Sequence, residues 1–81
     1  MNLRLDKFLK VSRIIKRRTV ANEISSQGRV KINDKTAKPG SEVKPGDVIS
    51  IQFGDRTRQY QVLAVSDHVS KEDAGQMYRE I

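Results

Sequence analysis

The sequence predicts an α+β fold, with two N-terminal helices packed on a small antiparallel β-sheet and a further helix at the C-terminus. Three changes in the spacing of apolar residues support this prediction. Helical spacing runs through the first part of the chain, alternation with polar residues follows from Val30, and helical spacing returns after Ser70. A chain of 81 residues is enough for one domain with one small core, so residues 1–81 are expected to form a single unit.

The first helix is expected over residues 3–15. Leu5, Phe8 and Leu9 stand at positions i, i+3 and i+4, which places them on one apolar face. The basic residues between them point elsewhere and remain available to solvent or to a ligand. Residues 12–13 are expected to end this helix or to form a turn.

The second helix is expected over residues 17–26. Val20, Ala21 and Ile24 are predicted to supply its inner face, and the small side chain of Ala21 lets the two helices approach closely. Gly28 is well placed to end the helix, because glycine adopts the left-handed conformation at little cost.

Apolar and polar residues then alternate, as in half-buried strands. Ile49, Ile51 and Phe53 are predicted to form the apolar face of a central strand. Residues with strong turn preferences separate the alternating segments. The strands are expected near residues 30–32, 49–53 and 56–65, with turns at Asn33-Asp34, Pro45-Gly46-Asp47 and Gly54-Asp55 and a loop over residues 38–41.

The last helix is predicted to begin at Ser70, with Asp73 placed to complete a weak capping box. Its apolar residues fall at i, i+3, i+4 and i+7, a stripe that should fold back on the sheet. The residues of this stripe are Ala74, Met77, Tyr78 and Ile81.

Positive charge is concentrated in the first part of the chain. Residues 1–35 hold ten basic and three acidic side chains, whereas the remainder holds six basic and seven acidic ones. A segregated basic region is what a polyanion-binding surface requires, because each neutralised phosphate releases counterions. The asymmetry favours nucleic acid as the partner over a surface that is charged only for solubility.

Composition excludes several kinds of chemistry. Cysteine is absent, so disulfides, thiolate metal sites and cysteine nucleophiles cannot form, and His68 is the single histidine. His68 beside Asp67 is interpreted as a loop residue rather than half of an acid–base pair, and neither a cofactor, a metal nor a catalytic site is expected. No apolar run resembles a signal peptide or a membrane span, so a cytoplasmic protein without membrane contact is expected.

An ordered set of residues resembles a known RNA-binding module. The set comprises Arg4-Leu5-Asp6-Lys7, Leu9, Arg13, Arg17-Arg18, Ala21, Ile24, Gly28, Val30, Ile32-Asn33, Val43, Gly46-Asp47, Ile49 and Ile51. In this order and spacing it resembles the module named after small-subunit ribosomal protein S4, also called the αL motif. The resemblance covers about residues 4–51 and leaves a hairpin and a helix over residues 52–81. Asp34 stands where the family usually has glycine.

The two helices would form a rigid platform with basic residues on its exposed side. Such a surface reads the shape and backbone of folded RNA more than its base sequence. Asp6 is predicted to organise a neighbouring arginine or to cap the first helix, and Tyr60 and Tyr78 are assigned to the core rather than to base stacking. The predicted RNA-binding residues are Arg4, Lys7, Lys10, Arg13, Lys16, Arg17 and Arg18.

Stand-alone members of the family are few, and this chain looks closest to those of ribosome quality control in Gram-positive bacteria. The resemblance implies a non-enzymatic factor that binds large ribosomal subunits obstructed by peptidyl-tRNA. Its implied partners are large-subunit rRNA, the P-site tRNA and the tailing factor RqcH, which brings alanyl-tRNA to extend the stalled chain; a monomer is expected. Two alternatives stay open: a heat-shock-type S4 protein that binds such subunits without tailing, and a protein-interaction adaptor using the sheet and final helix.

Overall fold

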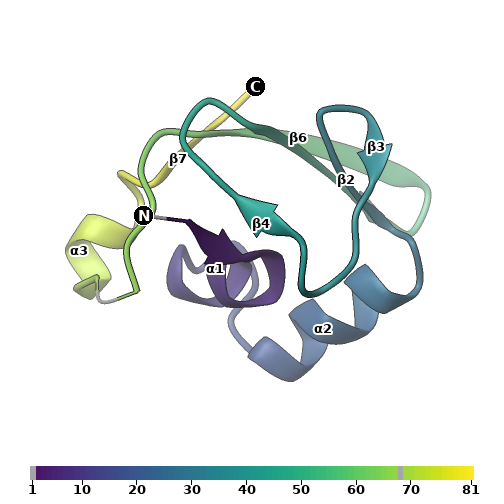
Figure 1. Ribbon diagram of the computed structural model, residues 1–81, viewed down its shortest axis with the longest axis horizontal. Helices are drawn as coiled ribbons and strands as arrows, with labels where there is room; N and C mark the ends of the chain where they lie inside the picture. Colours follow the sequence, from purple (N-terminus) through teal and green to yellow (C-terminus); the bar gives the residue numbers. More distant parts are fainter. Residues whose placement is uncertain (1, 68) are drawn as a thin grey trace.

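The computed structural model describes residues 2–67 and 69–81, and it confirms the predicted α+β class. Two helices lie on one side of an antiparallel sheet, and a short third helix lies beside them near the C-terminus (Figure 1). The elements in chain order are β1 (Leu3–Arg4), α1 (Leu5–Val11), α2 (Arg18–Ser26), β2 (Val30–Ile32), β3 (Lys35–Thr36), β4 (Glu42–Val43), β5 (Val48–Phe53), β6 (Arg56–Val62), α3 (Lys71–Ala74) and β7 (Tyr78–Glu80).

The strands form one five-stranded sheet and one separate two-stranded pair. The larger sheet has the order β3-β2-β5-β6-β7 with antiparallel neighbours throughout, and β1 pairs with β4. In the longest pair, β5 with β6, Ile49 lies opposite Tyr60 and Ile51 opposite Arg58. Side chains alternate between the two faces of a strand, so Ile49, Ile51 and Tyr60 share the face that meets the helices.

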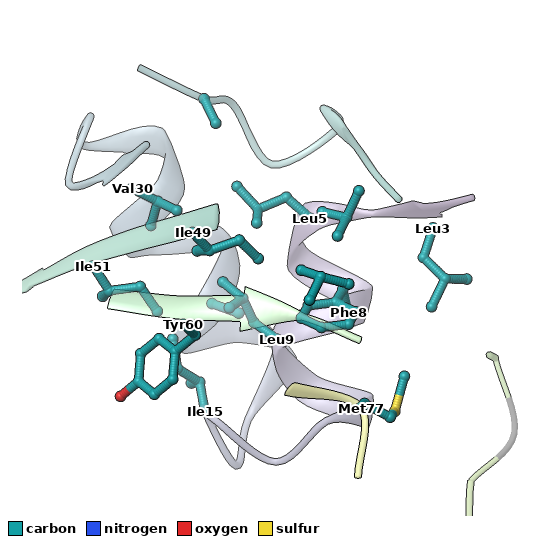
Figure 2. Close-up of a cluster of buried hydrophobic side chains, with 14 residues drawn as sticks. Leu3, Leu5, Phe8, Leu9, Ile15, Val30, Ile49, Ile51, Tyr60 and Met77 are labelled. Atoms are coloured by element: carbon teal, nitrogen blue, oxygen red, sulfur yellow. The ribbon is translucent and has the colours of Figure 1, made fainter. Parts of the chain in front are cut away.

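The hydrophobic core lies between that face and the first two helices. Leu5, Phe8, Leu9 and Ala21 are fully buried, as the helical spacing predicted. They pack in one cluster with apolar residues of the sheet, as Figure 2 shows for the labelled side chains. The sheet contributes Val30, Ile49, Ile51, Tyr60 and Val62 to this cluster.

The first helix is shorter than predicted. It begins at Leu5 and ends at Val11, whereas Leu3 and Arg4 form a strand. The cause is tertiary: Leu3 pairs with Val43 and is buried, and the N–H of Leu5 donates to the carbonyl of Ser41 at 2.7 Å. Strand pairing with a distant segment therefore overrides local helix preference at the N-terminus.

The C-terminal helix also differs from the prediction. Only residues 71–74 are helical, and Tyr78 begins the edge strand β7, which pairs with β6. The predicted cap at Ser70 is confirmed, because its side chain accepts from the N–H of Asp73. Ala74 and Met77 are buried, but Ile81 is 65% exposed, so the predicted apolar stripe is wrong at its end. The second edge of β6 is available to Tyr78–Glu80, and pairing there satisfies the backbone groups of this segment.

Two further apolar predictions are wrong. Val20 and Phe53 are each 40% exposed, although both were assigned to inner faces. Val20 lies on the flank of the narrow stripe centred on Ala21. Phe53 stands at the hairpin end of β5, opposite Arg56, and is not part of the core cluster. Strand β6 ends at Val62 rather than Val65.

The predicted turn at Asn33-Asp34 is confirmed as the two-residue connection of a hairpin. Both residues are left-handed, with φ of 52° and 67°, as a tight turn between twisted antiparallel strands requires. Asp34 thus keeps the backbone conformation for which the family uses glycine. The Asn33 side chain donates to Asp47 and accepts from the N–H of Val48, which ties the turn to the start of β5.

Candidate RNA-binding site

A buried carboxylate joins the two N-terminal helices. Asp6 lies in the first turn of α1 and is only 2% exposed. It accepts hydrogen bonds from the backbone N–H of Lys7 at 2.8 Å and from the Asn22 side chain of α2 at 3.3 Å. Two nitrogens of Arg4 donate to its two oxygens at 3.2 and 3.3 Å, and the guanidinium of Arg18 lies 3.6 Å away. The prediction that Asp6 organises neighbouring arginines is confirmed.

The surroundings of Asp6 favour its ionised form. Burial alone would raise its pKa, because it removes the charged form from water. The hydrogen bond from Asn22, the charges of Arg18 and Arg4 and the backbone N–H of Lys7 together outweigh burial and lower the pKa below its ordinary value of 3.8. Asp6 is therefore a carboxylate at neutral pH.

The two arginines that contact Asp6 still face solvent. The side chains of Arg4 and Arg18 are 56% and 48% exposed. A guanidinium has five N–H donors, so contact with one carboxylate leaves several donors directed outward. The arrangement fixes two arginines from different elements side by side, each able to bind a phosphate bidentately.

The start of α2 adds to the positive potential of this surface. Arg17 is the N-cap residue, with extended φ and ψ of −117° and 131°, and no side chain caps the helix there. The first turn of α2 contains no acidic residue. Free backbone N–H groups and the helix dipole therefore reinforce the charge of Arg17 and Arg18.

The seven predicted residues form two groups rather than one. Arg4 and Arg18 meet at Asp6, whereas Lys10, Arg13 and Lys16 line a cavity at the other end of α1. Neither group includes Lys7, which is half-buried, or Arg17, which is exposed.

Sequence reasoning missed the role of Asn22. It lies four residues after Arg18, one helical turn further along α2, so both side chains reach Asp6 from the same face. That spacing was the available signal.

The two tyrosines agree with their assignment to the core. Tyr60 is buried, and its ring makes an edge-on contact with the ring of Tyr78, with ring centres 5.4 Å apart. His68 lies outside the described residues, so its predicted loop role stays a prediction.

Among residues 2–67 and 69–81, no group of three or more His, Cys, Asp and Glu side chains could hold a metal ion. In the same residues, no helix combines the length and apolar character that crossing a bilayer requires.

The fold is that of an S4-type RNA-binding module, because a family model described as the S4 domain matches residues 3–49. The RQC P-site tRNA stabilizing factor of Bacillus subtilis (strain 168) is 53% identical over 76 residues, which cover 94% of this chain and 88% of the relative. Its counterpart from Streptococcus pneumoniae (strain ATCC BAA-255 / R6) is 49% identical over 79 residues, covering 98% and 90%. The chain therefore belongs to the S4 domain family, in the group of the RQC P-site tRNA stabilizing factors.

A solved structure shares the same fold. The heat shock protein 15 of Vibrio cholerae, whose structure is described as trimeric, matches with a TM-score of 0.88 and 32% identity. The match covers 100% of this chain and 83% of that chain. The family predicted from the residues is thus confirmed. The relatives that share about half of this chain's residues are P-site tRNA stabilizing factors rather than enzymes.

Proposed function

We propose that this protein binds large ribosomal subunits obstructed by peptidyl-tRNA and holds the P-site tRNA in place during ribosome quality control. One observation carries the proposal: the Arg4–Asp6–Arg18 cluster presents two fixed arginines, in a chain that shares 53% of its aligned residues with an RQC P-site tRNA stabilizing factor. The function is one of binding, and no bond chemistry is assigned to the chain.

The mechanism is positional. Arg4 and Arg18 contact phosphates of rRNA or tRNA, and the free N–H groups at the start of α2 add to the attraction. Because Asp6 holds both arginines in one geometry, little side-chain freedom is lost when RNA binds. A tRNA held against the large subunit in this way stays in place between successive additions to the nascent chain.

We further propose that the protein acts in the cytoplasm as a monomer and supports alanine tailing with the tailing factor RqcH. The identity of 53% with the Bacillus subtilis factor supports this role over that of a heat-shock-type protein, because identity with the trimeric Vibrio cholerae protein is 32%. The protein-interaction adaptor is less well supported, because residues 1–35, which contain α1, α2 and the turn between them, hold ten basic and three acidic side chains.

Sucrose-gradient sedimentation of cell lysate tests the proposal. The protein should sediment with large subunits, and the RNA that is purified with it should contain large-subunit rRNA and tRNA. Deleting the tailing factor should abolish alanine tails but leave subunit binding in place. Migration at the top of the gradient at low salt, without rRNA or tRNA, would contradict the proposed function.

A further inference from the structure

A cavity of about 340 Å³ lies between the C-terminal end of α1 and the segment that precedes α3. Figure 1 shows that this segment and α3 lie beside α1. Three cationic side chains and one carboxylate line the cavity, together with two half-buried valines. The lining residues are Lys10, Val11, Arg13, Lys16, Asp67 and Val69.

Arg13 has a backbone conformation that arginine rarely adopts. Its φ is 64°, in the left-handed region that favours glycine because a Cβ atom is crowded there. The left-handed residue reverses the chain after α1, so the N–H of Ile15 reaches the carbonyl of Leu9 at 3.0 Å and Ile15 becomes buried. The fold therefore requires this conformation at position 13, but it does not require the arginine side chain.

A residue kept in an unfavourable conformation suggests a function for its side chain. Arg13 is exposed, and no salt bridge within 4 Å joins it to a described acidic residue. Its guanidinium is thus available to a ligand in the cavity, with Lys10 and Lys16 as further point charges.

We infer that this cavity binds one phosphate group of an RNA backbone, with Arg13 as its main contact. Among the described residues that line the cavity, three cations face one carboxylate, and this excess of positive charge suits a single phosphodiester. This inference rests on the proposed function, since it names a second contact on the same RNA. Lys10 and Val11 of the cavity lie in the last turn of α1, whereas Arg4 precedes its first residue, so the two sites lie at opposite ends of a helix about 10 Å long and bind different phosphates.

Substitution of Asp67 should change RNA affinity in the opposite direction to substitution of a cationic residue. It is the acidic residue of the cavity, and within the described part of the chain no ion pair links it to the three cations. Its carboxylate therefore repels a bound phosphate more than it organises the cationic side chains. Asp67→Asn should tighten binding, whereas removal of a cation should weaken it.

The experiment uses the full chain and two probes: a single-stranded RNA dodecamer with hydroxyl ends, and inorganic phosphate. Arg13→Gly and Arg13→Asn both tolerate the left-handed conformation, so Tm should be no lower than in the wild type. Affinity for the dodecamer should fall roughly fivefold to tenfold, as for one lost charge-assisted contact, and should rise with Asp67→Asn. Lys38→Ala, an exposed lysine outside the cavity, is the control and should change neither quantity.

Unchanged dodecamer affinity in both Arg13 variants and in Lys16→Ala would overturn the inference. Saturable binding of inorganic phosphate in the cavity, without binding of the dodecamer there, would also overturn the inference, because the site would then bind free phosphate and not RNA. Large ribosomal subunits separate this failure from failure of the proposed function. If the wild type binds them and the Arg13 and Lys16 variants bind equally well, the cavity inference is wrong and the proposed function stands.

Discussion

The guanidinium of Arg18, in the first turn of α2, lies 3.6 Å from the carboxylate of Asp6, in the first turn of α1. The same carboxylate accepts two hydrogen bonds from Arg4. One buried anion thus links the two helices and sets the spacing of two exposed cations. Changes at Asp6 and at Arg18 should consequently have different effects on stability and on binding.

Arg18→Ala should weaken binding to large subunits and leave the fold intact. The side chain is 48% exposed and its ion pair is accessible to water, so its loss should change the free energy of unfolding by less than about 1 kcal/mol. Arg58→Ala is a matched control, because Arg58 is 58% exposed and has one ion pair, to Glu80, outside the predicted site. Equal subunit binding by the two variants, measured by co-sedimentation, would contradict the assignment of Arg18.

Asp6→Asn should lower both stability and affinity. The amide has one acceptor oxygen and no charge, so it cannot accept from Arg4, Asn22 and the Lys7 N–H together; because these donors are partly exposed, the loss should be about 1 kcal/mol. Arg4 and Arg18 would also lose their common anchor. Urea denaturation and subunit binding of the same preparation test both effects. A variant with wild-type stability would show that Asp6 does not hold the helices together.

The contribution of Asp6 to stability should depend on pH. Its pKa is lower in the folded state than its ordinary value of 3.8, so the folded state favours the ionised form. The contribution is therefore present in full above the unfolded-state pKa and is lost as the pH falls through the lowered folded-state pKa. The difference in free energy of unfolding between wild type and Asp6→Asn, measured from pH 7 to pH 2, should shrink below about pH 4. A difference that grows on acidification would have the wrong sign.

Subunit affinity should fall steeply with salt. Each phosphate contact contributes a slope of roughly −0.7 to −0.9 to the plot of log affinity against log salt concentration. Arg18→Ala should make the slope shallower by about one such unit, and Arg58→Ala should not. Affinity that is independent of salt would indicate docking through protein contacts instead.

The parts of the fold that the sequence predicted well are those with repeated local patterns. Leu5, Phe8 and Leu9 define α1 by their spacing, and the alternation around Ile49 and Ile51 defines β5. The short strands β1, β4 and β7 have two or three residues each and no pattern of their own. They exist because partner strands offer unpaired backbone groups, and that information lies elsewhere in the chain.

The candidate site was predictable in composition but not in arrangement. Charge segregation and the family resemblance pointed to the basic residues, and the pairing of Asp6 with a neighbouring arginine was expected. The sequence did not predict that the cations divide into two groups. This division depends on the chain reversal at Arg13, whose left-handed conformation usually favours glycine. Asn22 was missed since an asparagine within a helix has many possible roles.

The most direct test of the central claim compares purified large subunits that carry a P-site tRNA with the same subunits after the tRNA has been removed. The protein should bind the tRNA-carrying subunits more tightly, and the variant Arg18→Ala should lose most of that preference while remaining folded, because its ion pair is exposed. Equal affinity of the wild type for both kinds of subunit would contradict the claim that it holds the P-site tRNA.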